Sequence, residues 1–225
     1  MKKVSISFLI LSILFCVCLV VSNLFETKLV QIGPMTLTAG LLVFPISYII
    51  NDCIVEVWGF RKARFVIWTG FACNILVLLL GALAIWLPSP DYWEGESSFN
   101  FVFGLAPRIT LASMAAFLMG SFLNAYVMSR MKLSSAGRHF SIRAILSSVI
   151  GESADSLVFF PIAFAGLMPL KELLMMMLLQ ALIKTMYEVI VLPITILVVK
   201  NIKKYEDTDV FDDNVSYKFW RFFDI

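Results

Sequence analysis

Residues 35–57 read MTLTAGLLVFPISYIINDCIVEV and residues 65–87 read FVIWTGFACNILVLLLGALAIWL, with the basic connection WGFRKAR between them. Each run is apolar over about 20 residues, the length that a helix needs to cross a bilayer. The first run nevertheless contains two carboxylates, Asp52 and Glu56. A charge inside hydrocarbon costs about 2.5–3.5 kcal/mol on insertion scales, so these acids need a partner or a role. The stretch therefore predicts two membrane-spanning helices, the first with a polar face.

Four further apolar runs, at 5–21, 109–128, 144–166 and 173–199, extend the same pattern along the chain. Hydrophobic residues make up 60% of the sequence and charged residues 15%, with a mean hydropathy of +0.89. Soluble domains are about half apolar and a quarter charged. We expect an all-α polytopic membrane protein, a six-transmembrane-helix bundle in one domain over residues 1–225, with 200–225 as a short cytoplasmic tail. The first run lacks a small-x-small cleavage site, which favours an uncleaved span over a signal peptide.

Basic residues orient this bundle. All of the 18 Lys and Arg residues except Lys28, Arg108, Lys171 and Lys184 fall in the N-terminal segment, in the connections after the second and fourth spans, or in the tail. Because translocation disfavours Lys and Arg, both termini are predicted to be cytoplasmic. The net charge of +2 follows from this asymmetry and indicates no nucleic-acid-binding patch.

Three of the predicted spans carry a pair of polar residues spaced three or four apart, so each pair shares one helix face. The pairs are Asp52 and Glu56, Glu152 and Asp155, and Lys184 and Glu188. Such faces avoid lipid by turning toward each other, where the carboxylates outnumber the one lysine. Surplus carboxylates must be protonated, face water or bind a cationic or amide-rich ligand. The pattern favours a substrate-binding and transport pathway over a network that only locks the helices together.

Enzyme chemistry is poorly supported by the sequence. It has no His-Glu-x-x-His, no Gly-x-Ser-x-Gly and no phosphate-binding glycine loop. The four cysteines, Cys16, Cys18, Cys53 and Cys73, lie in or beside spans without metal-ligand spacing, and His139 falls in a loop. We therefore predict no enzymatic activity, no cofactor and no metal site.

Residues 51–64, NDCIVEVWGFRKAR, strongly resemble the YhhQ-type queuosine precursor transporters, also called the vitamin uptake transporter family. Further matching positions are Pro107 to Ile109, Leu111 to Ser113, Ser147, Ser148, Gly151, Asp155, Ser156, Lys184, Glu188, Pro193, Lys204 to Glu206 and Asp209 to Asp212. The resemblance implies a multi-pass importer in the bacterial inner membrane. Its substrates would be 7-deazaguanine bases for tRNA queuosine: 7-cyano-7-deazaguanine, 7-aminomethyl-7-deazaguanine or queuine. One departure is Glu152, where many members carry Gln, and this added carboxylate bears on substrate choice or proton stoichiometry.

The ligand that this resemblance implies suits carboxylates. A deazaguanine presents a ring N–H beside an exocyclic amine, which one carboxylate accepts as a bidentate pair, and a cationic aminomethyl group suits a second. Asp52, Asp155 and Glu188 are the first choices for these contacts. Lys184 would hydrogen-bond the base carbonyl or neutralise a neighbouring acid.

Three further residues are candidates for auxiliary roles. Trp58 or Phe159 would provide an aromatic platform on which a flat base stacks. Arg108, near the outer interface, would guide entry or anchor its helix by snorkelling.

The energy source stays open at the level of sequence. A secondary importer with protons as the coupling ion is favoured, because no ATP-binding element is present and central carboxylates can titrate. A substrate-binding membrane subunit that docks on a separate ATP-driven module would have the same six short-looped helices. A non-transporting membrane scaffold is a third alternative.

Overall fold

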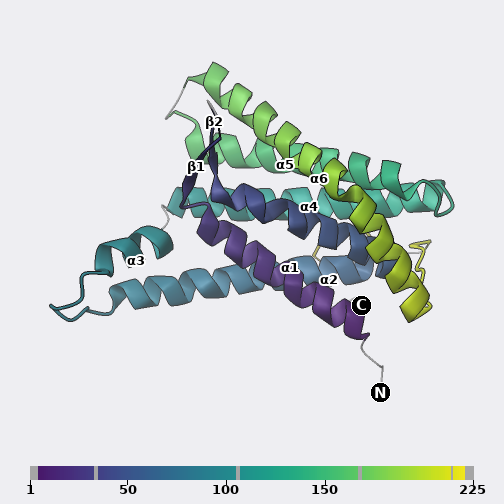
Figure 1. Ribbon diagram of the computed structural model, residues 1–225, viewed down its shortest axis with the longest axis horizontal. Coiled ribbons are helices and arrows are strands. Elements are labelled where there is room, and N and C mark those ends of the chain that lie inside the picture. Colours follow the sequence, from purple (N-terminus) through teal and green to yellow (C-terminus); the bar gives the residue numbers. More distant parts are fainter. Residues whose placement is uncertain (1–4, 33–34, 105–106, 167–168, 214, 221–225) are drawn as a thin grey trace.

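The computed structural model describes residues 5–32, 35–104, 107–166, 169–213 and 215–220. In chain order its elements are α1 (Ile6–Phe25), β1 (Leu29–Ile32), β2 (Met35–Thr38), a 3-10 helix η1 (Ala39–Leu42), α2 (Phe44–Trp86), α3 (Glu96–Phe103), α4 (Pro107–Ser134), α5 (Phe140–Phe164) and α6 (Leu170–Glu206). The long helices lie side by side as a bundle (Figure 1). The strands and α3 lie at one end, called here the hairpin end. The turn between α4 and α5 and the last turns of α6 lie at the other, the turn end.

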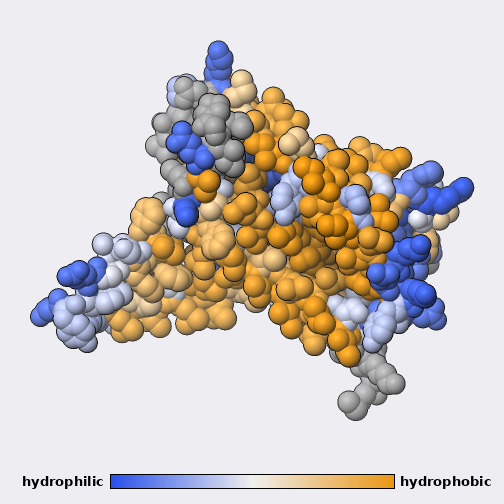
Figure 2. Space-filling view, in the orientation of Figure 1, coloured by the Kyte–Doolittle hydropathy of each residue, from blue (hydrophilic) through white to orange (hydrophobic). Residues whose placement is uncertain are grey.

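The surface of the bundle is that of a membrane protein. Five helical segments in the described ranges are long and apolar enough to cross a bilayer: α1, η1 with α2, and most of α4, α5 and α6. Leucine and isoleucine side chains on these helices face outward, as at Leu79, which is 64% exposed, and Ile190, which is 69% exposed. Figure 2 shows hydrophobic surface over the middle of the molecule and hydrophilic patches toward its ends. The protein is therefore a multi-pass membrane protein.

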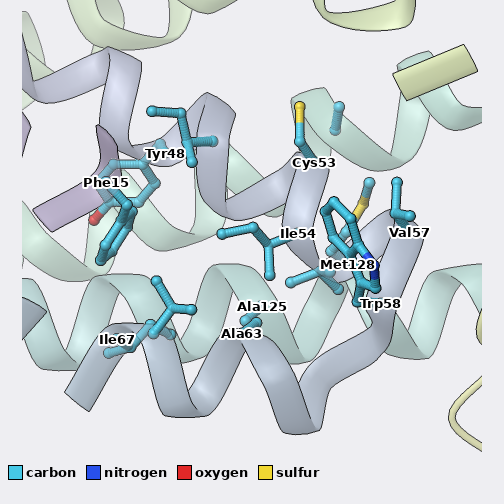
Figure 3. Close-up of a cluster of buried hydrophobic side chains, with 14 of the residues drawn as sticks. Phe15, Tyr48, Cys53, Ile54, Val57, Trp58, Ala63, Ile67, Ala125 and Met128 are labelled. Atoms are coloured by element: carbon cyan, nitrogen blue, oxygen red, sulfur yellow. The ribbon is translucent and has the colours of Figure 1, made fainter. Parts of the chain in front are cut away.

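Helix α2 reverses direction at Gly59. At about 1.5 Å per residue a straight helix of 43 residues would span about 64 Å, roughly twice the hydrocarbon thickness. Gly59 instead has φ 81° and ψ 173°, outside the helical region, which divides α2 into a first arm (44–58) and a second arm (60–86). Figure 3 shows the two arms side by side, with Ile54 of the first pointing toward Ala63 and Ile67 of the second. All three side chains are fully buried, so the core of the bundle lies between the arms.

The C-terminal segment 207–220 packs against this reversal. The Val210 N–H donates to the Val57 carbonyl over 3.1 Å. Asp212 is buried and accepts a hydrogen bond of 2.9 Å from the Phe60 N–H. Phe60 is the first residue of the second arm, where a backbone N–H has no acceptor within its own helix. Residues 200–225 were predicted to be a short cytoplasmic tail. In the structure α6 continues to Glu206, and the segment after it caps a helix.

The residues around the hairpin depart from the predicted all-α fold. The span expected at 35–57 begins with β2, which pairs antiparallel with β1 from Leu29–Thr38 to Ile32–Met35, and the helix starts only at Phe44. The sequence Met-Thr-Leu-Thr alternates apolar residues with β-branched ones, a period of two that suits a strand. The protein is thus mostly helical with a small two-stranded sheet, and the prediction of helix at 35–38 was wrong.

Close contact between α4 and α5 depends on two glycines. A Cβ on Gly151 would lie 2.7 Å from the Asn124 Cβ, and one on Gly120 would lie 2.8 Å from the Gly151 carbonyl oxygen. Real side chains do not tolerate such distances, so the two backbones meet only because both residues lack a Cβ. This contact brings the polar residues of α4 and α5 together in the centre of the bundle.

Candidate functional site

A cavity of about 420 Å³ lies among α1, α2, α3, α4, α5, α6 and the end of β2. Its volume is within the range of about 300–1,000 Å³ that is usual for small-ligand sites. The polar lining is Asn23, Glu26, Thr38, Asn74, Ser113, Asp155, Gln180 and Lys184, and the aromatic lining is Phe44, Phe103, Phe159, Phe160 and Phe164. The cavity therefore combines a few convergent polar groups with flat apolar walls.

An ion pair between α5 and α6 faces the cavity. Lys184 Nζ lies 3.0 Å from Asp155 Oδ2, and both residues are buried. The same ammonium lies 4.2 Å from the centroid of the Phe44 ring, a cation–π contact. Two of the predicted site residues are thus brought together, next to an aromatic ring at the start of the first arm of α2.

The opposite part of the lining is a neutral amide network that joins three helices. Asn23 on α1 donates from Nδ2 to Asn74 Oδ1 over 2.7 Å, and the Ser113 hydroxyl on α4 donates to Asn23 Oδ1 over 2.9 Å. Asn74 in turn donates to the Gly70 carbonyl. These bonds orient the amides, so their remaining capacity is directed at whatever occupies the cavity.

Glu26 adds a second carboxylate to the lining. It follows the last residue of α1 and accepts a hydrogen bond from Thr38 at the end of β2. Burial raises the pKa of Glu26, whereas the Thr38 hydrogen bond and nearby Lys184 lower it, and the net shift is upward from the ordinary value. Glu26 was not among the site residues predicted from the sequence.

Three further predicted carboxylates lie behind the cavity and are not part of its lining. Glu188 Oε1 accepts a hydrogen bond of 2.5 Å from the Ser148 hydroxyl, which also lies 3.5 Å from Asp52 Oδ2. The Asp52 and Glu188 carboxyl groups are close enough to hydrogen-bond each other. Glu152 accepts from the Thr185 hydroxyl over 3.1 Å. We call Asp52, Glu152 and Glu188 the inner carboxylates.

A chain of hydrogen bonds holds the inner carboxylates across four helices. Asn51 donates to Asn124 Oδ1 over 2.8 Å, Asn124 donates to the Ser148 hydroxyl over 3.3 Å, and Ser148 donates to Glu188. The chain runs from α2 through α4 and α5 to α6. Asn124 and Ser148 can reach each other because the glycine contact lets α4 and α5 approach closely.

Several polar atoms in this region receive no hydrogen bond from the part of the chain that the structure describes. They are the Tyr48 hydroxyl, Asn51 Oδ1, Asp52 Oδ1, Glu152 Oε1, the Ser156 hydroxyl and Glu188 Oε2. Buried polar atoms normally have a partner. Their concentration in one place leaves hydrogen-bonding capacity at the inner carboxylates that the described residues do not use.

Glu56 belongs to a different cluster, at the turn end. Its carboxylate binds Arg143 through two contacts of 2.5 and 3.0 Å and Lys203 through one of 2.6 Å. Lys132 and Lys203 both pair with Asp209, at 2.5 and 2.8 Å. Glu56 was predicted to be one of the substrate-binding and transport residues. In this structure its charge is neutralised by basic residues from α5 and α6.

The predicted auxiliary residues have separate surroundings. Phe159 lines the cavity and stacks edge-on with Phe160, with ring centroids 5.3 Å apart. Trp58 is buried against Phe8, with centroids 5.4 Å apart, and does not line the cavity. The side chain of Arg108 lies outside the described residues.

Four residues of the cavity lining were not among the predicted site residues: Asn23, Glu26, Ser113 and Phe44. Asn23 and Glu26 stand at the end of the first apolar run, where a polar residue is usually read as the membrane interface. Spacing within one span gave no signal for them, because their partners are on other helices. Only the packing of α1 against α2 and α4 places them at the cavity.

Comparisons with known proteins agree on one family. The profile of a family described as "Putative vitamin uptake transporter" matches residues 38–198. A Bacillus subtilis (strain 168) protein named "Probable queuosine precursor transporter" is 27% identical over 177 residues, covering 77% of this chain and 76% of the relative. The "Queuosine precursor transporter" of Escherichia coli (strain K12) is 30% identical over 127 residues, covering 56% and 55%. A Haemophilus influenzae protein named "Probable queuosine precursor transporter" is 29% identical over 127 residues, covering 56% and 52%.

No solved structure matches the chain. The family profile nevertheless extends over well more than half of the 225 residues, from the end of β2 to the last turns of α6. It includes the ion pair, the inner carboxylates and Glu56. The chain belongs to the vitamin uptake transporter family, which is a family of transporters and not of enzymes.

Proposed function

We propose that this protein imports a queuosine precursor, a 7-deazaguanine base, across the bacterial inner membrane. The observation that carries the proposal is the cavity of about 420 Å³, in which the Asp155–Lys184 pair faces aromatic residues. The names of the relatives support the substrate class. The candidate bases are 7-cyano-7-deazaguanine, 7-aminomethyl-7-deazaguanine and queuine.

The cavity chemistry suits this class of ligand. The ring N–H and exocyclic amine of the base donate to the Asp155 carboxylate, and Lys184 donates to the base carbonyl. Phe159 and Phe160 offer faces for the ring system, and base–aromatic stacking contributes about 1–3 kcal/mol per base. The amides of Asn23 and Gln180 complete the hydrogen bonds at the ring edge.

The proposed importer crosses the membrane six times and has both termini in the cytoplasm. The two arms of α2 count as separate crossings, because Gly59 reverses the helix. The turn end holds the basic connection after Trp58, the basic α4–α5 turn and the basic last turns of α6 (Figure 1). By the positive-inside rule this end is cytoplasmic, and the hairpin end with the cavity lies toward the periplasm.

The proposed importer is a secondary transporter driven by protons. Two carboxyl groups hydrogen-bond each other only when one of them carries a proton, and Asp52 and Glu188 are placed for that contact. Ser148 contacts both and can pass a proton between them. Substrate binding at Asp155 would couple to these groups through α5, which carries both Ser148 and Asp155.

The test is uptake by liposomes that contain this protein alone. Neutral 7-cyano-7-deazaguanine is the first substrate, with the membrane potential clamped, because a cation would be drawn in by the potential itself. We expect accumulation when the outside is acidic, and a protonophore should abolish accumulation while downhill equilibration continues. If accumulation does not change with the imposed pH gradient, proton coupling is excluded.

The same liposomes distinguish an autonomous carrier from a subunit of an ATP-driven system. Tight binding without flux would identify a subunit that needs an ATP-driven partner. A cell that lacks queuosine synthesis and import gives an independent measurement: with this chain supplied, tRNA queuosine should return when the correct base is added. Absence of both binding and restored queuosine for every deazaguanine would exclude the proposed function.

A further inference from the structure

Glu26 is held in place at the cavity by the residues that follow it. Thr38 at the end of β2 donates to its carboxylate. Gly40 is buried, and a Cβ on it would overlap Glu26 Oε1. The absence of a side chain at Gly40 therefore makes the space that the carboxylate occupies. The Thr38 hydrogen bond and the space left at Gly40 together place the Glu26 carboxylate at the cavity.

The charges of the cavity do not balance. Among the lining residues that the structure describes, the ionisable charges are Glu26, Asp155 and Lys184. Lys184 already pairs with Asp155 at 3.0 Å and contacts the Phe44 ring. With all three groups ionised, the lining carries one net negative charge, and that charge belongs to Glu26.

Glu26 and the ion pair are near enough to act on one small ligand. Both Lys184 and Asp155 interact electrostatically with Glu26, although Glu26 comes from the end of α1 and the pair from α5 and α6. A ligand between them meets a neutral pair of opposite charges on one side and an unbalanced carboxylate on the other. A base with a cationic substituent matches that arrangement, because its positive charge offsets the surplus.

We propose that Glu26 is the specificity-determining carboxylate of the cavity, which binds the cationic amine of an amine-bearing deazaguanine while the Asp155–Lys184 pair binds the base. The inference rests on the proposed function and names the substrate class of the same site. It predicts that the protein prefers 7-aminomethyl-7-deazaguanine over neutral 7-cyano-7-deazaguanine. The two bases have the same ring system, so their difference isolates the amine.

The experiment measures the dissociation constants of both bases for purified protein in detergent. Glu26→Gln keeps the shape of the side chain and removes its charge. We expect the ratio of the two affinities to shift by about tenfold against the amine, the size of one charge-assisted hydrogen bond. Glu94→Gln is the matched control, because Glu94 is an exposed carboxylate outside the cavity lining, and it should leave the ratio as in the wild type.

Two further variants keep the test decisive if Glu26→Gln does not fold. Gly40→Ala retains the carboxylate but fills its space, and should also lower the preference for the amine. Glu26→Asp retains the charge on a shorter side chain, and should give an intermediate ratio. An unchanged ratio in folded Glu26→Gln, or in both other variants, would overturn the proposal. Failure of the wild type to bind either base would instead count against the proposed function.

Discussion

Asp155 and Glu56 are both buried acids within predicted spans, but they have different surroundings. Asp155 pairs with one lysine at the edge of a cavity. Glu56 is enclosed by Arg143 and Lys203 and does not line this cavity. Breaking a buried ion pair by removing one partner costs about 3–5 kcal/mol, so substitution at either site affects stability as well as function. Predictions for single residues must therefore separate the two effects.

Asp155→Asn is expected to reduce uptake more severely than Glu152→Gln. The first substitution removes a carboxylate from the cavity and leaves Lys184 without its partner. The second keeps an oxygen for the Thr185 hydroxyl at a position behind the cavity. Uptake of radiolabelled base is measured at matched levels of folded protein.

A double variant, Asp155→Asn with Lys184→Gln, controls for stability because it restores the charge balance. If Asp155 binds substrate, the double variant folds better than the single one but still does not transport. Recovery of uptake in the double variant would show that the pair is structural.

Binding of the amine-bearing base should depend on pH through Glu26. Burial raises the pKa of Glu26, and the negative charge of Asp155 on α5 raises it further. Thr38 from the hairpin and Lys184 from α6 lower it, but the net shift is upward. The ionised form binds the amine, so affinity is full above this raised pKa and falls as the pH drops through it. In Glu26→Gln the fall should be absent, which titration calorimetry across the pH range can measure. The neutral base is the control ligand.

The same shift has a consequence for stability with the opposite sign. The pKa of Glu26 is higher in the folded protein than in the unfolded chain. Glu26 therefore contributes fully to the free energy of unfolding at a pH below its ordinary pKa. This contribution is lost as the pH rises through the raised pKa. Binding and stability should therefore respond to pH in opposite directions. A binding curve for the amine that strengthens on acidification would contradict the assignment.

At the scale of elements, the reversal of α2 is the feature on which the site depends. Gly59 turns the first arm back along the second, and Asp212 caps the N-terminus of the second arm. The first arm carries Phe44 and Asp52 and the second carries Asn74, so the cavity and the inner carboxylates both need this geometry. The turn is held from outside the helix by a segment more than 150 positions further along the chain.

Gly59→Ala should lower the midpoint of thermal unfolding more than Gly166→Ala. Both glycines have positive φ, 81° and 82°, and Gly59, with ψ 173°, lies in a backbone region that is essentially restricted to glycine. A Cβ at Gly59 would also lie 2.7 Å from Asp212 Oδ1, whereas nothing lies within 4 Å of one at Gly166. The difference between the variants therefore reflects the backbone of Gly59 together with its contact with the C-terminal segment, and it is measured by tryptophan fluorescence in detergent. Equal midpoints would mean that the reversal does not require glycine at position 59.

Glu56→Gln should destabilise the fold by several kcal/mol, because Arg143 and Lys203 lose their shared carboxylate. Arg143→Met added to it removes one of the stranded cations and should restore part of the lost stability. The loss and its recovery are measured as unfolding midpoints. If Glu56→Gln instead unfolds like the wild type but fails in uptake, Glu56 has a role in transport, as the sequence pattern predicted.

The molecule as a whole is polarised between its two ends. The turn end joins α2, α4, α5 and α6 through the Glu56 cluster and the C-terminal segment. The hairpin end contains the cavity, lined by Thr38, Phe103 and Phe164. One end is thus closed by ion pairs while the other encloses a volume for a ligand, an asymmetry that suits a carrier loading from one side.

Cysteines at Ser97 and Ser135 should react with an impermeant thiol reagent from opposite sides of the membrane. Ser97 lies on α3 at the hairpin end, and Ser135 lies in the turn between α4 and α5. The four native cysteines are first replaced, and labelling is compared in intact cells and inverted vesicles. Labelling of the Ser135 position in intact cells alone would reverse the proposed orientation.

The sequence by itself determined that the chain is a membrane protein and which segments form long helices. It also determined that polar residues lie on helix faces at Asp52, Asp155 and Lys184. Hydropathy and helical spacing are local quantities, so one chain segment is enough to read them. The beginning of the second predicted span was missed because a hydropathy window averages over the alternation of Met35–Thr38, which is the signal of a strand.

Only the tertiary structure decided which acids share a cavity and which have cationic partners. Glu56 and Arg143 are 87 positions apart and Lys184 and Asp155 are 29 apart, and no spacing rule within a helix connects them. Glu26 and the inner carboxylates likewise acquire different surroundings from the packing of α1, α4 and α5. Electrostatic and hydrogen-bond energies depend on distance in space whatever the separation along the chain, so the division of the acids into ion-paired and cavity-lining groups is a property of the fold.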